Sequence, residues 1–418
     1  MTAELTNEEQ PTSFQEAVDS ASKHMWVKAM QNEMEALQEN HTWDIKNLPK
    51  NKRAIPCKWV YKMKTNADGS VERYKARLVI KGCSQRKGYD YDQTFSPVAK
   101  SGTIRSVLSI AANEGMLLRQ FDVSTAFLYG NLEEEIYMEQ PEGFNDGTGR
   151  VCRLNKSLYG LKQAPRCWNK RFGNFLIRLG FIVNEADPCL YIKENGSNKT
   201  ILALYVDDGL VASTNQTELF SLMNSLESEF KITHKAASYF LGFEISHRKD
   251  GSIKVSQEGY ARKILHRFGM SECKPVSTPI PKESIQSGKV SENDSNQELH
   301  FPYRQAVGAL MYLMTGTRPD IAYAVGVASR CLENPKPSDV VLVKRIFRYL
   351  KGTIDYGIIY KHKFKKGILE TFSDADLGGD EQTGRSTTGV VCIYAGGAVT
   401  WLELELEIDL FNEAQLGP

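Results

Sequence analysis

The sequence predicts an α+β protein that is divided into more than one domain. The chain has 418 residues, which is too long for a single compact core. Segments with apolar residues at helical spacing alternate with short segments of strand period that are joined by turn signals. A polar stretch rich in Pro and Ser, residues 273–300, interrupts this pattern and indicates a linker.

The composition is that of a globular protein without a membrane span. Of the residues, 41% are hydrophobic and 25% charged, with a net charge of +1. No run of about 18 apolar residues is present to cross a bilayer, and the acidic, polar N-terminus argues against a signal or transit peptide. The eight cysteines occur without a C-x-x-C pair, which disfavours a zinc site and disulfides and suits a reducing compartment.

Basic residues are concentrated in two segments. Residues 53–105 contain twelve Lys and Arg against four Asp and Glu, and residues 150–178 contain eight against none. The segment between them, 133–142, is acidic. Because local charge matters more than net charge for binding polyanions, a nucleic-acid partner is compatible with this chain.

The N-terminal third predicts a helix followed by a basic hairpin. Residues 12–40 have an amphipathic pattern, and Ser13 with Glu16 forms a capping-box signal. Two alternating segments joined by N-A-D-G then predict a β-hairpin. Such a hairpin suits phosphates and stacked bases, although a solvated ribbon face is the alternative. Its basic and aromatic residues are Lys58, Lys62, Lys64, Arg73, Lys75, Arg77, Lys81, Trp59, Tyr61 and Tyr74.

The following elements alternate between helix and strand. A strand, L-L-R-Q-F-D-V, is expected to place Asp122 at its end, and Y-F-L-G-F-E-I predicts a strand with a glycine in its middle. From Gly367 onward three strand-like segments follow. Helices are expected at 103–115, after S-L-Y-G-L-K-Q-A-P-R-C-W, and at 216–230, 260–268 and within 303–351.

The stretch I-L-A-L-Y-V-D-D-G-L-V-A-S, residues 201–213, is the centre of the chain. Its D-D-G predicts a hairpin turn between two buried strands, with Asp207 and Asp208 at the tip. Adjacent carboxylates repel each other and resist burial, so a metal ion is one natural compensation. An ordinary turn with solvated acids is the alternative.

Asp122 precedes this pair and ends a strand of its own. If the two strands are neighbours in one sheet, three carboxylates converge at its edge. Carboxylate oxygens suit magnesium, which takes its remaining ligands from water and substrate phosphates. Two such ions can activate a 3′-hydroxyl and stabilise the leaving pyrophosphate.

Several motifs together resemble a known family. Y-V-D-D and F-D-V-S-T-A-F-L resemble the active-site signature of reverse transcriptases. The motifs R-Y-K-A-R-L-V-I-K-G, E-E-I-Y-M-E-Q-P-E-G-F, S-L-Y-G-L-K-Q-A-P-R-C-W, R-Y-L-K-G-T and S-D-A-D-L-G-G-D resemble the Pol polyprotein of copia-type LTR retrotransposons. The resemblance covers residues 13–401, from the reverse transcriptase into ribonuclease H.

The resemblance implies a role for each matching residue. Asp122 and Asp207 would be the principal ligands of two Mg²⁺ ions, with Mn²⁺ as the alternative, and Asp208 would support them. Phe127 would lie beneath the incoming sugar and exclude a 2′-hydroxyl, although core packing is the alternative. The remaining implied site residues are Lys75 and Arg77 at the triphosphate, Gln163 in the nucleotide pocket, and Phe240, Leu241 and Gly242 in the primer grip.

The C-terminal part departs from the family. Asp374 would be the first metal ligand of ribonuclease H, but the resemblance to the family's sequence ends after Trp401. Glu403, Glu405 and Glu407 alternate with apolar residues instead and do not resemble the family's acidic helix. We therefore expect a truncated ribonuclease H segment without ribonuclease H activity.

The resemblance implies a right-hand fold of fingers, palm and thumb with a helical connection and a partial ribonuclease H-like end. The implied activity is RNA-directed DNA synthesis from deoxynucleoside triphosphates on an RNA or DNA template-primer, with no membrane partner. Alternatives are a degenerate copy that binds nucleic acid without polymerising and a magnesium phosphohydrolase. The implied location is the cytoplasm, in virus-like particles, or the nucleus. The expected division is 1–49 N-terminal helical segment, 50–272 fingers, palm and thumb, 273–300 linker, 301–366 connection and 367–418 ribonuclease H-like segment.

Overall fold

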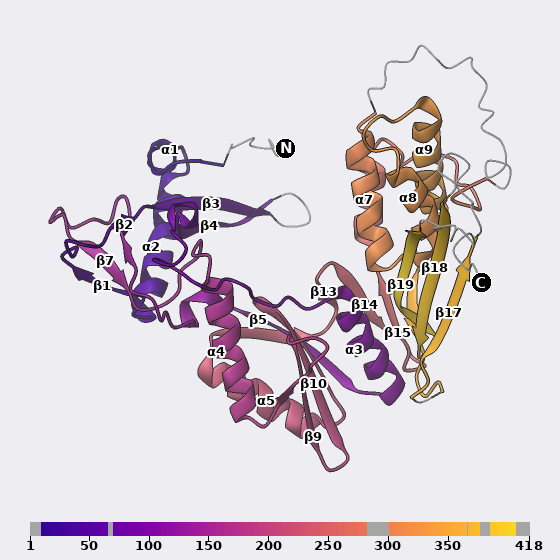
Figure 1. Cartoon of the computed structure of the whole chain (residues 1–418), viewed down its shortest axis with the longest axis horizontal. Coiled ribbons are helices and arrows are strands. Elements are labelled where there is room, and N and C mark those ends of the chain that lie inside the picture. Colours follow the sequence, from indigo (N-terminus) through magenta and orange to yellow (C-terminus); the bar gives the residue numbers. More distant parts are fainter. Residues whose placement is uncertain (1–9, 66–69, 282–300, 366, 377–384, 407–418) are drawn as a thin grey trace, which may run out of the picture.

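A six-stranded antiparallel sheet lies at the centre of the structure, a computed structural model that describes residues 10–65, 70–281, 301–365, 367–376 and 385–406 (Figure 1). Asp208 is the cross-strand partner of Asp122, so the predicted neighbouring of their two strands is confirmed. The strands, in their order across the sheet, are β12 (Ile232–Ala236), β5 (Leu117–Val123), β11 (Asp208–Ser213), β10 (Asn198–Tyr205), β9 (Leu190–Asn195) and β8 (Ile182–Val183).

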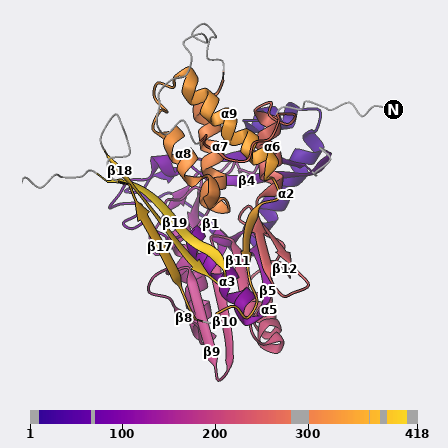
Figure 2. The same ribbon diagram turned by 90° about the vertical axis from the view of Figure 1, so that its right-hand side faces the viewer.

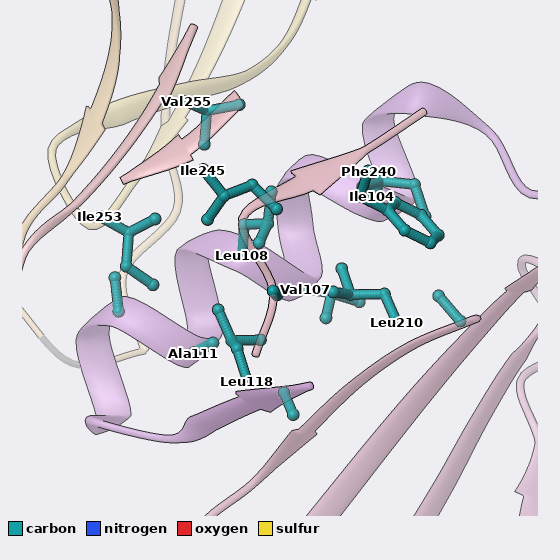
Figure 3. Close-up of a cluster of buried hydrophobic side chains, with 14 of the residues drawn as sticks. Ile104, Val107, Leu108, Ala111, Leu118, Leu210, Phe240, Ile245, Ile253 and Val255 are labelled. Carbon is teal, nitrogen blue, oxygen red and sulfur yellow. The ribbon is translucent and has the colours of Figure 1, made fainter. Parts of the chain in front are cut away.

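Helices cover both faces of this sheet because side chains alternate between the faces along each strand. One face packs on α4 (Ala164–Arg178) and α5 (Gln216–Glu229). The other packs on α3 (Ser101–Glu114), which ends at Gly115 in the left-handed conformation, as the sequence predicts. Figure 3 shows the apolar side of α3 between the strands that carry Leu118 and Leu210 and a second set of strands.

The hairpin and the N-terminal helices form a second unit with a core of its own. The predicted helix over 12–40 is two helices, because the chain is extended at Ser20. Ser13 caps the first helix by accepting from the Glu16 amide, as expected. The N-A-D-G turn lies outside the described residues. The elements are α1 (Phe14–Asp19), α2 (Lys23–Glu39), the hairpin of β3 (Cys57–Thr65) and β4 (Val71–Ile80), and a sheet of β1 (Trp43–Lys46), β7 (Val151–Leu154), β6 (Tyr137–Met138) and β2 (Ala54–Ile55).

The segment Y-F-L-G-F-E-I is a hairpin, so the predicted single strand with a central glycine is wrong. Leu241 and Gly242 both have positive φ and form the turn between β13 (Tyr239–Phe240) and β14 (Phe243–His247). The hairpin continues into β15 (Ile253–Ser256), and β16 (Gly357–Tyr360) pairs with that strand. Residues more than a hundred positions apart therefore share one small sheet.

Helices on both sides of the predicted linker share one core. They are α6 (Glu258–Arg267), α7 (Tyr303–Gly316), α8 (Ala322–Ser329) and α9 (Pro337–Gly352). These helices pack together as one unit, although the sequence prediction placed α6 in the thumb and α7–α9 in a separate connection. Residues 282–300 lie outside the described part of the chain.

Three antiparallel strands follow these helices (Figure 2): β17 (Glu370–Ala375), β18 (Ser386–Tyr394) and β19 (Gly397–Leu406). The Trp401 indole donates to the Met314 carbonyl at 3.1 Å and so ties β19 to α7. The strands agree with the sequence prediction, and the side chains of Glu403, Glu405 and Glu407 lie outside the described residues. Among the helices of the described residues, none has the length and apolar character of a membrane span.

Candidate polymerase active site

The turn of the β10–β11 hairpin lies one residue before the predicted tip at Asp207 and Asp208. Tyr205 pairs with Asp208, so the turn consists of Val206 and Asp207, while Asp208 and Gly209 already belong to β11. Asp207 is therefore in the turn, as predicted, whereas the prediction that Asp208 and Gly209 form part of the turn is wrong. Of the two turn residues, Val206 has a positive φ of 56° and Asp207 does not.

The surrounding structure holds this turn in place. A β-branched residue in the left-handed region is strained and persists only where contacts over-determine it. The Trp168 indole donates to the Val206 carbonyl at 2.6 Å, and the Val123 amide donates to the Asp207 carbonyl at 2.9 Å. Both bonds use backbone oxygens, so the Asp207 side chain is left for another function.

Asp122 and Asp207 face one cleft together with the basic hairpin. This cleft, of about 860 Å³, is lined by both acids and by four basic residues of β3 and β4. The basic residues are Lys64, Arg73, Lys75 and Arg77. The structure thus brings four of the expected site residues, Asp122, Asp207, Lys75 and Arg77, to one place.

The surroundings of Asp207 and Asp208 raise the pKa values of both carboxyl groups. Burial raises the pKa of Asp207, and Asp122 raises it further, while Lys75 and Arg77 oppose the shift. Burial, with Asp207 and Asp122, raises the pKa of Asp208 to about 6. Burial, together with the like charges at this edge of the sheet, therefore disfavours ionisation of Asp207 and Asp208, and a bound cation would offset this effect.

The donor set fits magnesium bound by two carboxylates. Magnesium is commonly held by one or two protein carboxylates, with water and substrate phosphates as further ligands. Asp122 and Asp207 supply hard oxygen ligands in one cleft. Within the described residues no group of three or more His, Cys, Asp and Glu is arranged to hold a metal, and Asp208 does not line the cleft, so its supporting role stays a prediction.

In the metal-free protein, Asp208→Asn is expected to raise the melting temperature by about 2 °C at pH 7.5. With a folded-state pKa of about 6, well above the ordinary 3.8, the wild type must ionise this carboxyl at a cost to the folded state. That cost falls as the pH drops from 6 toward 4, because the folded protein then takes up a proton. Thermal unfolding in EDTA at pH 7.5 and 4.5 measures both values. A gap between variant and wild type that does not narrow at low pH contradicts this account.

Phe127 lies in the short 3-10 helix η2 (Ala126–Tyr129), between Thr125 and Tyr129, which line the cleft, but it is not itself a lining residue. Its ring is half-buried and contacts the ring of Tyr159, with centroids 5.0 Å apart. The guanidinium carbon of Arg77 in turn lies over the Tyr159 ring, 5.0 Å from the ring centroid. Tyr159 was not predicted as a site residue, although it lies in the same S-L-Y-G-L-K-Q motif as Gln163.

The other expected residues do not line the cleft of Asp122 and Asp207. The Gln163 amide is buried, accepts from Gln85 and donates to the Asp90 carbonyl. It lines a different cleft, so its proposed contact with a nucleotide stays a prediction. Phe240 is buried in the core that backs the central sheet, and Leu241 and Gly242 form the turn beside it. Asp374, on β17, lines a separate cleft of about 730 Å³ with Asp376.

A six-stranded antiparallel sheet with two acids in a basic cleft, a hairpin unit with its own core and a helical unit together define a right-hand polymerase fold. Residues 40–282 match the family model described as reverse transcriptase (RNA-dependent DNA polymerase). The chain belongs to this family, in its copia-type retrotransposon branch.

Two relatives show the extent of the likeness. The chain is 44% identical over 405 residues to the retrovirus-related Pol polyprotein from transposon TNT 1-94 of Nicotiana tabacum, covering 95% of this chain and 30% of that protein. It is 39% identical over 392 residues to the polyprotein from transposon RE1 of Arabidopsis thaliana, covering 92% and 26%. The chain thus spans less than a third of either relative.

Among solved structures, a foamy viral protease-reverse transcriptase in complex with double-stranded DNA has a TM-score of 0.49 and 11% identity. The alignment covers 91% of this chain and 56% of that one.

Proposed function

We propose that this chain copies an RNA or DNA template by adding deoxynucleotides to a primer 3′-hydroxyl. The observation that carries this proposal is the shared cleft, in which two carboxylates face the cationic side chains of β3 and β4. Carboxylates suit metal ions, and cationic side chains suit the triphosphate that those ions also contact. A phosphohydrolase needs neither the hairpin nor the turn of Leu241 and Gly242.

Each side chain has a distinct part in the proposed reaction. Asp122 and Asp207 would hold magnesium, which when bound supplies positive charge at the attacking and leaving oxygens. Lys75 and Arg77 would bind the triphosphate and offset charge that develops on it. Burial lowers the pKa of the Lys75 ammonium. We infer that Tyr159 and Phe127 shape the floor on which the incoming sugar lies.

Primer extension with the purified chain tests the proposal. The assay uses primed poly(rA), deoxythymidine triphosphate and magnesium, with EDTA as the control, and extension that needs both template and magnesium is expected. Absence of extension with retained binding of the template-primer would instead support the degenerate copy that only binds nucleic acid. Release of phosphate without a template would support the phosphohydrolase.

Phe127→Val is expected to weaken discrimination against ribonucleotides by about a hundredfold, because a smaller side chain leaves room for a 2′-hydroxyl. Incorporation of deoxythymidine triphosphate should change little. The measurement compares kcat/KM for uridine and deoxythymidine triphosphates on the same template-primer. Equal losses for both nucleotides would indicate that Phe127 only packs the core.

A further inference from the structure

The N-terminal helix α2 forms one wall of the cleft that contains Asp122 and Asp207. Five of its residues line this cleft: Ala29, Asn32, Glu33, Ala36 and Glu39. The family match begins at residue 40, so it does not include α2. The site is therefore built partly by a segment that precedes the matched domain.

Aromatic contacts fix α2 on the basic hairpin. The Trp26 ring meets the rings of Tyr61 and Tyr74 edge-on, with centroids 5.3 and 4.6 Å apart. The Tyr61 hydroxyl also donates to the Met30 sulfur at 3.2 Å. Because these side chains are large and well packed, α2 is a rigid support for whatever it holds at the cleft.

Glu33 is the charged residue of α2 that points into the hairpin. Its side chain is only 3% exposed, and its Oε2 accepts from Nη1 of Arg77 at 2.7 Å. The other carboxylate oxygen, Oε1, is buried without a hydrogen-bond partner within the described part of the chain. Burial raises the pKa of Glu33, while Arg77 opposes that shift. A buried carboxylate is costly, so this one calls for a function.

The contacts of Arg77 leave part of its guanidinium open to the cleft. Glu33 binds Nη1, and the guanidinium carbon lies over the ring of Tyr159, 5.0 Å from the ring centroid. The side chain remains 25% exposed, and Arg77 lines the cleft with Asp207. A guanidinium has five N–H donors in a fixed fork, so the hydrogen bond from Nη1 to Glu33 and the contact with the Tyr159 ring together set the direction of the remaining donors.

We propose that Glu33 is a positioning residue that orients Arg77 toward the triphosphate of the incoming nucleotide. This inference rests on the proposed function and extends it to α2. The opposite arrangement, in which Glu33 holds Arg77 away from the nucleotide, predicts the opposite result, because removal of the carboxylate would then tighten nucleotide binding.

Nucleotide binding to a stalled complex tests the proposal without requiring catalysis. The full chain is bound to a template-primer whose primer ends in a dideoxynucleotide, and the Kd for deoxythymidine triphosphate is measured with magnesium. Glu33→Ala should raise this Kd about tenfold and Glu33→Gln, which keeps an acceptor, about threefold. In primer extension the same variants should raise KM while kcat changes less than about twofold. Glu35→Gln, an exposed acid on the same helix, should match the wild type.

A double-mutant cycle separates positioning from general packing. In an Arg77→Ala background, Glu33→Gln should have no further effect on the Kd, because its only route to the nucleotide is gone. An unchanged or tighter Kd in a folded Glu33 variant, or an equal loss in both backgrounds, overturns the proposal. Absence of nucleotide binding by the wild type overturns it too, whereas binding without extension overturns only the proposed function.

Discussion

Asp207→Asn is expected to lower primer extension by about a thousandfold while the fold and template-primer binding are retained. A carboxylate that holds magnesium contributes several kcal/mol of charge stabilisation in the transition state, and a neutral amide is a poor substitute. The turn itself should persist, because its hydrogen bonds use the backbone oxygens of Val206 and Asp207. Removal of a half-buried charge with a raised pKa does not destabilise the site.

The matched control for this variant is another aspartate in a hairpin turn. Asp250 lies between β14 and β15, where its carboxylate accepts from the amide and hydroxyl of Ser252. Asp250→Asn keeps an acceptor oxygen and should extend primers like the wild type. Single-turnover extension and a gel-shift titration measure both variants. Substantial extension by Asp207→Asn with magnesium would refute the assignment of this residue.

Sequence alone predicted the elements whose signals are local. The apolar runs of β10 and β11, the alternation in β3 and β4, and the terminal glycine of α3 depend on neighbouring residues and all appear as expected. The convergence of Asp122 with the β10–β11 acids could also be predicted, because both lie at ends of strands in one antiparallel sheet.

One turn was misplaced and another was not predicted, because tertiary contacts decide both. Local rules favour glycine in a turn, so D-G suggested the tip of the β10–β11 hairpin, whereas Val206 adopts the left-handed conformation under the hydrogen bond from Trp168. In Y-F-L-G-F-E-I, a leucine shares the turn with the glycine, and a leucine at positive φ is rarely anticipated.

Packing between distant segments could not be predicted. The pairing of Glu33 with Arg77 joins residues 44 positions apart, and neither side chain carries a local signal for the other. The same limit applies to Tyr159, whose place beside Phe127 and Arg77 depends on how the loop before α4 crosses the end of β4. The shared core of α6 with α7–α9 is hidden in sequence by the polar segment between them.

Gly209→Ala is expected to destabilise the protein by about 3 kcal/mol, because this glycine makes room for an aromatic ring. Phe121 is its direct cross-strand partner, and a Cβ added at position 209 would lie 2.0 Å from the end of the Phe121 ring. The ring cannot withdraw easily, since it stacks on Phe172 with centroids 6.1 Å apart inside a buried core.

Urea unfolding measures the loss in free energy of unfolding, with a strand glycine that has open space at its Cβ position as the control. Gly389 lies in β18, and a Cβ there would meet no atom of the described part of the chain within 4 Å, so Gly389→Ala should be nearly neutral. Phe121→Leu should destabilise the protein on its own by leaving a cavity. The double variant with Gly209→Ala should lose less stability than the sum of the two single losses, because the shorter side chain vacates the space that the new methyl group needs. Strictly additive losses would show that the ring does not set the requirement for glycine.

Since Asp208 precedes Gly209 and Asp122 follows Phe121, the same contact fixes the spacing of the strand ends that carry the acids, and a loss of extension should accompany the loss of stability.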